Sequence, residues 1–349
     1  MASGKKIAKL KDVAAVAGVS VAAVSRYLGG SLLLPPETAS RIDSAVRSLN
    51  YQPNPHARRL SRGRSDVIGL VIPDIANPFF ARIAAEIETS VDSEGYGLVL
   101  CITMNRPGRE IEYPNRLRRN YVDGLIFMTN HAGDAKLAKA INDAGLVVLV
   151  DEDIRGTSVH KIFCDNEEGG YLATRHLLEA GHRRIAFVGG PKSMLTTRER
   201  LAGYRRAIKE SGPDASSIAE LFGEYTIEHG RAAAKNLISH VPHATGVFFT
   251  SDEVLLGGLE VLEQHGQRIP SDVSVVTFDD VEPLHLFTPP ITAVRQPLAE
   301  IGRRSVQAVI FPDDRADLPM VERLPVSLIV RASVAPPSAQ RRSGRVLGR

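Results

Sequence analysis

Residues 10–28 read LKDVAAVAGVSVAAVSRYL, and this stretch decides the fold of the amino-terminal part of the chain. Small and apolar side chains recur at helical spacing before Gly18, and they recur again after Ser20, at Val24 and Leu28. Gly18 suits the end of one helix, and Ser20 suits the N-cap of the next. The pattern predicts two short helices joined by a tight turn.

The second of these helices has an outer face that suits DNA. If Val24 and Leu28 are buried, the pair is a helix-turn-helix whose second helix enters the major groove. An arginine can donate two hydrogen bonds to a guanine edge, and small apolar side chains can contact thymine methyl groups. The expected DNA-binding residues are Ser20, Val21, Ala22, Ser25 and Arg26. The alternative is an αα-hairpin inside a larger core, with a merely solvated Arg26.

Charge supports the DNA-binding interpretation. The 349 residues carry a net charge of +3, but residues 1–65 alone carry +8 and residues 331–349 carry +5. The intervening part is therefore acidic. A basic head on an acidic body favours binding of the head to a polyanion, whereas a solvated charged tail is the simpler alternative.

The remainder of the head predicts a third helix and a linker. Pro36 is a favoured first residue of a helix, and apolar residues follow it at helical spacing. A helix after Asn54 and Pro55 would be too short to be stable alone. We expect a helix-turn-helix headpiece in residues 1–50 and a hinge in residues 51–66, followed by a core in residues 67–330 and a disordered basic tail in residues 331–349.

The core alternates apolar strands with amphipathic helices. This alternation predicts α/β structure, and its length favours two doubly wound lobes with parallel sheets, with crossovers near residues 164 and 293. Expected strands cover residues 67–72, 98–102, 124–128, 146–150, 185–188, 246–250 and 273–278. Expected helices include residues 80–94, 167–180, 200–211, 228–239 and 253–265.

Polar and aromatic residues follow several of the expected strands. Ligands bind at the carboxyl ends of parallel strands, where carboxylates can accept hydrogen bonds from sugar hydroxyls and aromatic rings can stack on a sugar or a base. The candidate ligand-binding residues of this kind are Asp74, Phe79, Phe80, Asp165, Ser251 and Asp279. Either phenylalanine could instead be plain core, and Asp252 is expected to be only a helix N-cap.

Other classes of protein are disfavoured. No run of about 18 apolar residues indicates a membrane span, and no apolar signal sequence follows the start, so a cytoplasmic location is expected. Cys101 and Cys164 have neither disulfide-framework nor zinc-ligand spacing, and we expect no metal or cofactor. The segment 189–193 lacks the glycine that a phosphate loop needs before Lys192, and no catalytic motif is present. The chain is not expected to be an enzyme.

Several motifs resemble the lactose-repressor (LacI/GalR) family of bacterial transcription regulators. Besides the helix-turn-helix, they are NYQPNPHARRL (50–60), IGLVIPDIANPFF (68–80), GHRRIAFVGG (181–190), RLAGY (200–204), SVVTFDD (274–280) and RQPLAEIG (295–302). The resemblance implies a DNA-binding headpiece and a core like the periplasmic sugar-binding proteins, with two lobes around a ligand cleft. It also implies that Arg200 points into the cleft and binds a ligand oxygen.

For the hinge, the resemblance implies two short helices, one per protomer of a homodimer, folded in the minor groove of a pseudo-palindromic operator. Leu60 would then be a wedge between base steps, with Asn54, Ala57 and Arg58 against the groove and backbone. The alternative is that Leu60 only packs against the core.

The chain departs from the family pattern at Gly29–Gly30, at Pro35 and at Ser251, and its Val21 and Ala22 are smaller than the polar residues of some members. These departures leave the operator and the ligand open. The expectation is a repressor controlled by a small polar ligand, with a sugar favoured. The alternatives are a nucleobase corepressor and, less favoured, a sugar-binding protein without a regulatory role.

Overall fold

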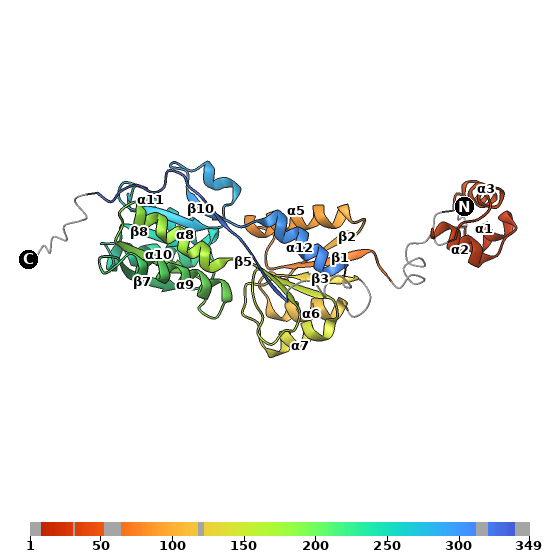
Figure 1. Cartoon of the computed structure of the whole chain (residues 1–349), viewed down its shortest axis with the longest axis horizontal. Coiled ribbons are helices and arrows are strands. Elements are labelled where there is room, and N and C mark those ends of the chain that lie inside the picture. The colour runs from red at the N-terminus through yellow and green to blue at the C-terminus, as the bar shows by residue number, and fades with distance from the viewer. Residues whose placement is uncertain (1–7, 31, 52–63, 118–121, 312–319, 339–349) are drawn as a thin grey trace, which may run out of the picture. The chain divides into compact units, whose positions relative to one another are not determined.

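The computed structural model describes residues 8–30, 32–51, 64–117, 122–311 and 320–338. The chain divides into two compact units, Met1–Ser65 and Asp66–Arg349. Figure 1 shows the small helical unit and the larger α/β unit. The expected fold class, a helical headpiece plus a two-lobed α/β core, is confirmed.

The headpiece contains α1 (Leu10–Ala17), α2 (Val21–Leu28) and α3 (Pro36–Ser48). Gly18 makes the turn between the first two helices with a φ of 66°, in the left-handed region that glycine adopts without strain. Ser20 caps α2, because its hydroxyl accepts a hydrogen bond from the Ala23 amide at 3.1 Å. The three helices enclose a small apolar core made of Val13, Ala14, Ala17, Val24, Ile42 and Ala45.

The first lobe of the core is a six-stranded parallel sheet. Its strand order is β11 (Val321–Leu324), β5 (His160–Cys164), β4 (Val147–Val150), β3 (Gly124–Phe127), β1 (Val67–Ile72) and β2 (Gly97–Ile102). Helices α5 (Pro78–Ser93) and α12 (Leu298–Ile310) cover one face, and α6 (Pro107–Leu117) and α7 (Ala135–Ala144) cover the other (Figure 1). The strands are largely apolar because both faces of the sheet are covered.

The second lobe repeats this plan. Its sheet has the order β12 (Ser327–Ile329), β10 (Thr292–Arg295), β9 (Ser274–Phe278), β8 (Gly246–Phe249), β6 (Arg184–Gly189) and β7 (Ser216–Phe222), and only the β10–β12 pair is antiparallel. Helices α8 (Asn166–Glu179) and α9 (Leu195–Glu210) pack on one face. Helices α10 (Ile227–His240) and α11 (Asp252–Gln264) pack on the other, and the 3₁₀ helix η1 (Glu282–His285) follows β9.

The chain passes between the two lobes three times. It leaves the first sheet after β5, returns between β10 and α12, and leaves again between β11 and β12. The sequence indicated only the first two crossings. The third joins two strands of four and three residues, which are too short to show a hydrophobic period.

The carboxyl-terminal segment corrects one expectation. Residues 331–338, expected to be disordered, lie against the second lobe. The buried Ser333 hydroxyl donates a hydrogen bond to the Val275 carbonyl at 2.6 Å, and the Ala335 amide donates one to the Ser274 hydroxyl at 3.1 Å. Composition could not indicate these contacts, because they use backbone groups and small side chains. Residues 339–349 lie outside the described residues.

Candidate ligand-binding cleft and DNA-contacting helix

The outer face of α2 has the geometry that the sequence predicts. Val24 is fully buried, while Val21, Ala22 and Arg26 are exposed, and Ala22 and Arg26 lie on the side opposite Val24. The Tyr27 hydroxyl donates a hydrogen bond to Asp43 at 3.1 Å and thereby ties α2 to α3. These contacts hold the exposed face on a packed three-helix unit.

Two of the expected DNA-binding residues have other contacts. The Ser20 hydroxyl serves as the helix cap described above, and Ser25 is half-buried. The hinge residues Asn54, Ala57, Arg58 and Leu60 lie outside the described residues, so their roles stay predictions.

A narrow cavity of about 30 Å³ lies where the two lobes meet. Both lobes contribute to its lining, mostly from segments that follow the carboxyl ends of strands. The lining residues are Asn77, Phe79, Phe80, Asn130, Asp151, Met194, Thr196, Arg200, Tyr225, Ser251, Asp252, Glu253 and Asp279. Arg200 is the one basic residue among the described residues that line it.

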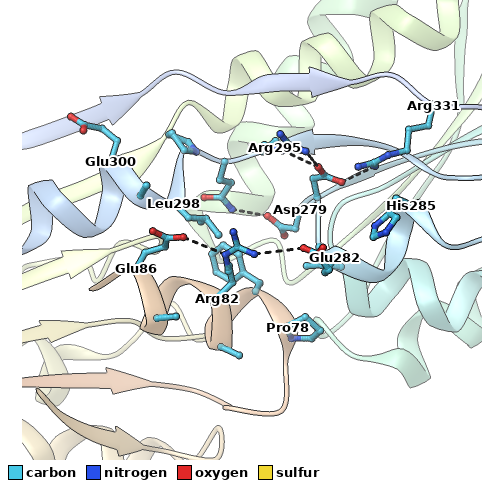
Figure 2. A pocket seen from close by; sticks show the side chains of 18 residues that line it. Pro78, Arg82, Glu86, Asp279, Glu282, His285, Arg295, Leu298, Glu300 and Arg331 are labelled. Atoms are coloured by element: carbon cyan, nitrogen blue, oxygen red, sulfur yellow. Dashed lines mark hydrogen bonds and ion pairs between the residues drawn. The ribbon is translucent and has the colours of Figure 1, made fainter. Parts of the chain in front are cut away.

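A larger cavity of about 1040 Å³ lies nearby, and Figure 2 shows its lining. Its charged side chains are largely paired with one another. Arg82 lies 3.3 Å from Glu86 and 3.6 Å from Glu282, and Arg295 lies 2.6 Å from Asp280. Gln296 Oε1 in the lining of this larger cavity also lacks a hydrogen bond among the described residues, whereas Asp280 Oδ1 is paired with Arg331 Nη1 at 2.7 Å. The narrow cavity is the better ligand site, because both lobes line it at the ends of strands and it contains two buried carboxyl oxygens without a donor among the described residues.

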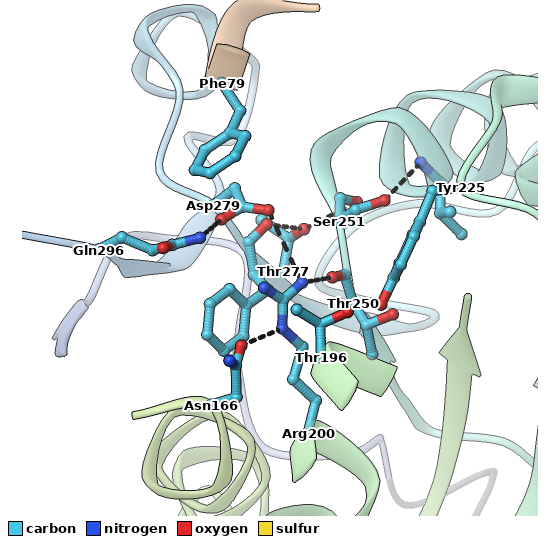
Figure 3. A network of polar contacts seen from close by, with 12 residues as sticks. Phe79, Asn166, Thr196, Arg200, Tyr225, Thr250, Ser251, Thr277, Asp279 and Gln296 are labelled. Atoms are coloured by element: carbon cyan, nitrogen blue, oxygen red, sulfur yellow. Dashed lines mark hydrogen bonds and ion pairs between the residues drawn. The ribbon is translucent and has the colours of Figure 1, made fainter. Parts of the chain in front are cut away.

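Arg200 is held rigidly in the narrow cavity (Figure 3). It is 3% exposed, and its Nε donates a hydrogen bond to Asn166 Oδ1 at 2.8 Å. Its Nη1 donates one to the Thr250 carbonyl at 2.5 Å, and the guanidinium carbon lies 3.6 Å from the centre of the Phe278 ring. Burial lowers the pKa of Arg200, but Tyr225 and the nearby carboxylates outweigh it and leave the group charged.

Asp279 directly follows β9, and a residue of the segment between β10 and α12 fixes its carboxyl group. Gln296 Nε2 donates a hydrogen bond to Asp279 Oδ1 at 2.7 Å. The backbone of Asp279 has a φ of 70°, a strained conformation for a residue with a side chain. Burial raises the pKa of its carboxyl group, although the charge of Arg200 opposes this shift.

In each of two further carboxyl groups of the cavity, one buried oxygen lacks a hydrogen-bond donor in the described part of the chain. Among the described residues, no group donates a hydrogen bond to the buried Oδ1 of Asp151 or to the buried Oδ2 of Asp252. Burial raises the pKa of Asp151 to about 7. Burial, together with the charges of Asp279 and Glu253, raises the pKa of Asp252 to about 7. Buried polar atoms are normally hydrogen-bonded, so these two oxygens are available to a ligand that donates.

The structure corrects the expectation for Asp252. Ser251, rather than Asp252, is the N-cap of α11, since its hydroxyl accepts a hydrogen bond from the Val254 amide at 3.3 Å. Asp252 is the first residue of the helix, 2% exposed, and it lines the cavity. A cap one residue earlier than expected therefore turns the carboxyl group toward the ligand site.

Two expected ligand residues do not line the cavity. Asp165 caps α8, where its Oδ1 accepts a hydrogen bond from the Glu168 amide at 3.0 Å. Asp74 accepts one from the Ala76 amide at 2.9 Å and so stabilises a local turn. For Phe79 and Phe80, both interpretations apply: the two rings line the cavity, and they also pack into the core of the first lobe.

Sequence reasoning missed several lining residues. Asp151 follows β4 directly, so the rule that ligands bind at the carboxyl ends of strands could have found it. Thr196 and Tyr225 come from a helix start and a loop of the second lobe. No local pattern marks these two, since only the tertiary fold brings them to the cavity.

The fold and the cavity define a DNA-binding regulator with a ligand-binding core, and comparisons with known proteins agree. Residues 9–54 match the family described as "Bacterial regulatory proteins, lacI family", and residues 174–334 match "Periplasmic binding protein-like domain". The chain is 34% identical over 310 residues to the HTH-type transcriptional regulator CelR of Thermobifida fusca, covering 86% of this chain and 90% of that one. It is 31% identical over 305 residues to the HTH-type transcriptional repressor PurR of Vibrio atlanticus, covering 87% and 91%.

Solved structures give the same result. A CelR–cellobiose complex is 32% identical with a TM-score of 0.70, and it covers 93% of this chain and 99% of that one. A lac repressor dimer bound to operator and the anti-inducer ONPF is 27% identical with a TM-score of 0.83, covering 95% and 100%. The chain therefore belongs to the lacI family of bacterial regulatory proteins, whose members are DNA-binding transcriptional repressors rather than enzymes. Among the described residues, no helix could span a membrane.

Proposed function

We propose that this repressor is controlled by a neutral sugar bound in the narrow cavity between the lobes of its core. The observation that carries the proposal is the pair of buried oxygens, Asp151 Oδ1 and Asp252 Oδ2, that lack donors among the described residues. A sugar supplies several hydroxyl groups, each of which can donate one hydrogen bond and accept another. Carboxylates that lost their hydration on burial gain most from such donors.

Other lining residues fit the same ligand. The amide side chain of Asn130 can both donate and accept hydrogen bonds, and the Phe79 ring offers an apolar face. Cavities that bind small ligands typically combine apolar and aromatic walls with a few polar groups that fix orientation. The structure of the relative CelR is a complex with cellobiose, which supports the proposal that the effector of this chain is also a sugar.

Ligand binding requires the lobes to move. The cavity of about 30 Å³ has room for about one or two water molecules, and a sugar ring is several times larger. A ligand can shift the affinity for DNA only if it binds one arrangement of the lobes better than another. We propose that the sugar binds an arrangement that releases the operator, so that it acts as an inducer.

On DNA, the protein is proposed to act as a homodimer. The lac repressor relative was solved as a dimer bound to operator, and a single headpiece with one short reading helix buries little surface on DNA. Static light scattering of the full chain at micromolar concentration should give twice the mass of 37.8 kDa. A monomer or a stable tetramer would contradict the dimer.

A ligand screen tests the proposed effector class. The full chain is melted with and without monosaccharides, disaccharides and nucleobases, because a ligand that binds only the native state raises the melting temperature. We expect at least one neutral sugar to raise it, and Arg200→Ala to remove the effect of that sugar. If only a nucleobase raises the melting temperature, the proposed sugar effector is wrong, and a nucleobase corepressor takes its place.

A further inference from the structure

Glu152 joins the two lobes through three hydrogen bonds. It follows β4 in the first lobe, and its side chain contacts the start of α9 in the second lobe. Oε1 accepts a hydrogen bond from the Leu195 amide at 2.6 Å, and Oε2 accepts from the Thr196 amide at 3.2 Å and from the Thr196 hydroxyl at 2.9 Å. The Glu152 side chain is almost completely buried.

These bonds provide the cap that α9 itself lacks. A helix leaves its first amide groups without partners, and a carboxylate there also interacts favourably with the helix dipole. The N-cap residue of α9 is Met194, which makes no capping side-chain hydrogen bond. Five other core helices use their own N-cap side chains, namely Asn77, Asp134, Asp165, Thr226 and Ser251, whereas α12 follows Pro297 and has no side-chain cap. The first turn of α9 is thus completed by the opposite lobe.

A second contact holds the same helix to the first lobe. Arg323 of β11 pairs with Glu199 of α9 through two hydrogen bonds of 2.7 and 2.6 Å. Arg200, the next residue of α9, lies in the ligand cavity. The first lobe therefore contacts α9 at its first turn and again at Glu199, which directly precedes the cavity residue Arg200.

We propose that Glu152 is an interlobe latch that stabilises this closed arrangement of the two lobes. Parting the lobes breaks its three hydrogen bonds and leaves the α9 amides to water. Hydrogen bonds to a charged group are stronger than neutral ones, so their loss opposes opening. Since the closed cavity is too small for a sugar ring, a ligand of that size enters only when the latch releases.

Single-molecule energy transfer in the full chain tests the latch directly. Dyes are attached through Lys139→Cys on α7 and Lys235→Cys on α10, two exposed sites in different lobes, in a Cys101→Ser background. Cys164 is buried and should not react. Labelled chain is diluted into excess unlabelled chain, so that both dyes lie on one protomer. Without effector, we expect one main population of high transfer efficiency.

Glu152→Ala should raise the ratio of open to closed molecules by about tenfold, from the loss of hydrogen bonds to a charged group. Glu152→Gln keeps a carbonyl acceptor but no charge, and it should raise the ratio by about threefold. Arg323→Ala should shift the distribution in the same direction. Asp134→Ala is the matched control, because it removes a capping carboxylate from α7 within one lobe and should leave the distribution unchanged.

Two results would overturn the latch. One is an unchanged distribution in Glu152→Ala, or in Glu152→Gln if the alanine variant does not fold. The other is an equal shift in Asp134→Ala, which would show that any lost cap loosens the core. The test needs no sugar, so it can fail while the proposed effector class stands, and the reverse also holds.

Discussion

Arg200 and Asp279 form a buried charge pair in the cleft, with 3.8 Å between Nη1 and Oδ2. This separation exceeds a hydrogen bond, so each group uses other partners for its direct contacts. Asn166 and Thr250 accept from the arginine, and Gln296 donates to the aspartate. The pair is therefore positioned from several elements at once, and a ligand oxygen can approach it without dismantling these supports.

Arg200→Ala should abolish the response to the effector. It removes the one basic group among the described lining residues and leaves buried carboxyl groups without a countercharge, which should also destabilise the core by about 3–5 kcal/mol. Operator binding without effector should stay nearly intact at temperatures where the variant is folded. Arg205→Ala, which removes an exposed ion pair from the same helix, is the control. An unchanged ligand affinity in Arg200→Ala, measured by calorimetry, would show that the cleft is misassigned.

Asp252→Asn should make the unliganded protein more stable at pH 8, on the order of 1 kcal/mol. The pKa of Asp252 rises from 3.8 to about 7 on folding, so the folded state holds more protons than the unfolded state between these values. Stability therefore falls as the pH rises through this window, and the asparagine variant lacks that loss.

Thermal melts of both proteins from pH 5 to pH 8 check the sign. Asp165→Asn changes a helix cap outside the cavity, and its melting temperature should depend on pH in the same way as that of the parent protein. A steeper pH dependence in Asp252→Asn than in the parent would contradict the burial of an ionisable group at this site.

Arg26→Ala should weaken binding to the specific operator by about 1–3 kcal/mol and affect random DNA far less, because a bidentate contact to guanine discriminates between bases. Fluorescence anisotropy with both duplexes at one salt concentration measures this. Arg47→Ala, at an exposed position on α3, is the control. Equal losses on operator and random DNA would mean that Arg26 contacts only phosphate.

Leu60→Ala should reduce both operator affinity and DNA bending, since an apolar wedge lets the duplex bend at a cost of unstacking. The melting temperature of the core should not change. Bending is measured by energy transfer between dyes at the duplex ends. If the variant bends DNA as well as the parent does, or loses core stability instead, Leu60 is a packing residue.

Local patterns were enough to predict the headpiece. The glycine turn at Gly18, the cap at Ser20 and the buried Val24 all act over a few residues, and the structure shows each of them as expected. The alternation of strands and helices likewise gave the two-lobed core, because buried parallel strands are continuous apolar runs.

The cleft was harder to predict, because its groups act through distant partners. Asp165 and Asp252 both stand at helix starts, and only the hydrogen bonds show that the first is a cap and the second lines the cavity. Glu152 had no sequence signal at all, since the helix that it caps begins 43 residues later along the chain. Contacts of this kind depend on how the lobes close, which no local period encodes.

Operator binding as a function of sugar concentration tests the central claim most directly. A labelled duplex selected by the protein itself from random sequences is titrated with the full chain, with and without the sugar that raises its melting temperature. We predict that this sugar weakens operator binding by about 5- to 150-fold, the usual range for coupling between two sites, and has no effect on Arg200→Ala. A sugar that stabilises the protein but leaves its operator affinity unchanged would contradict the claim that the cleft controls DNA binding.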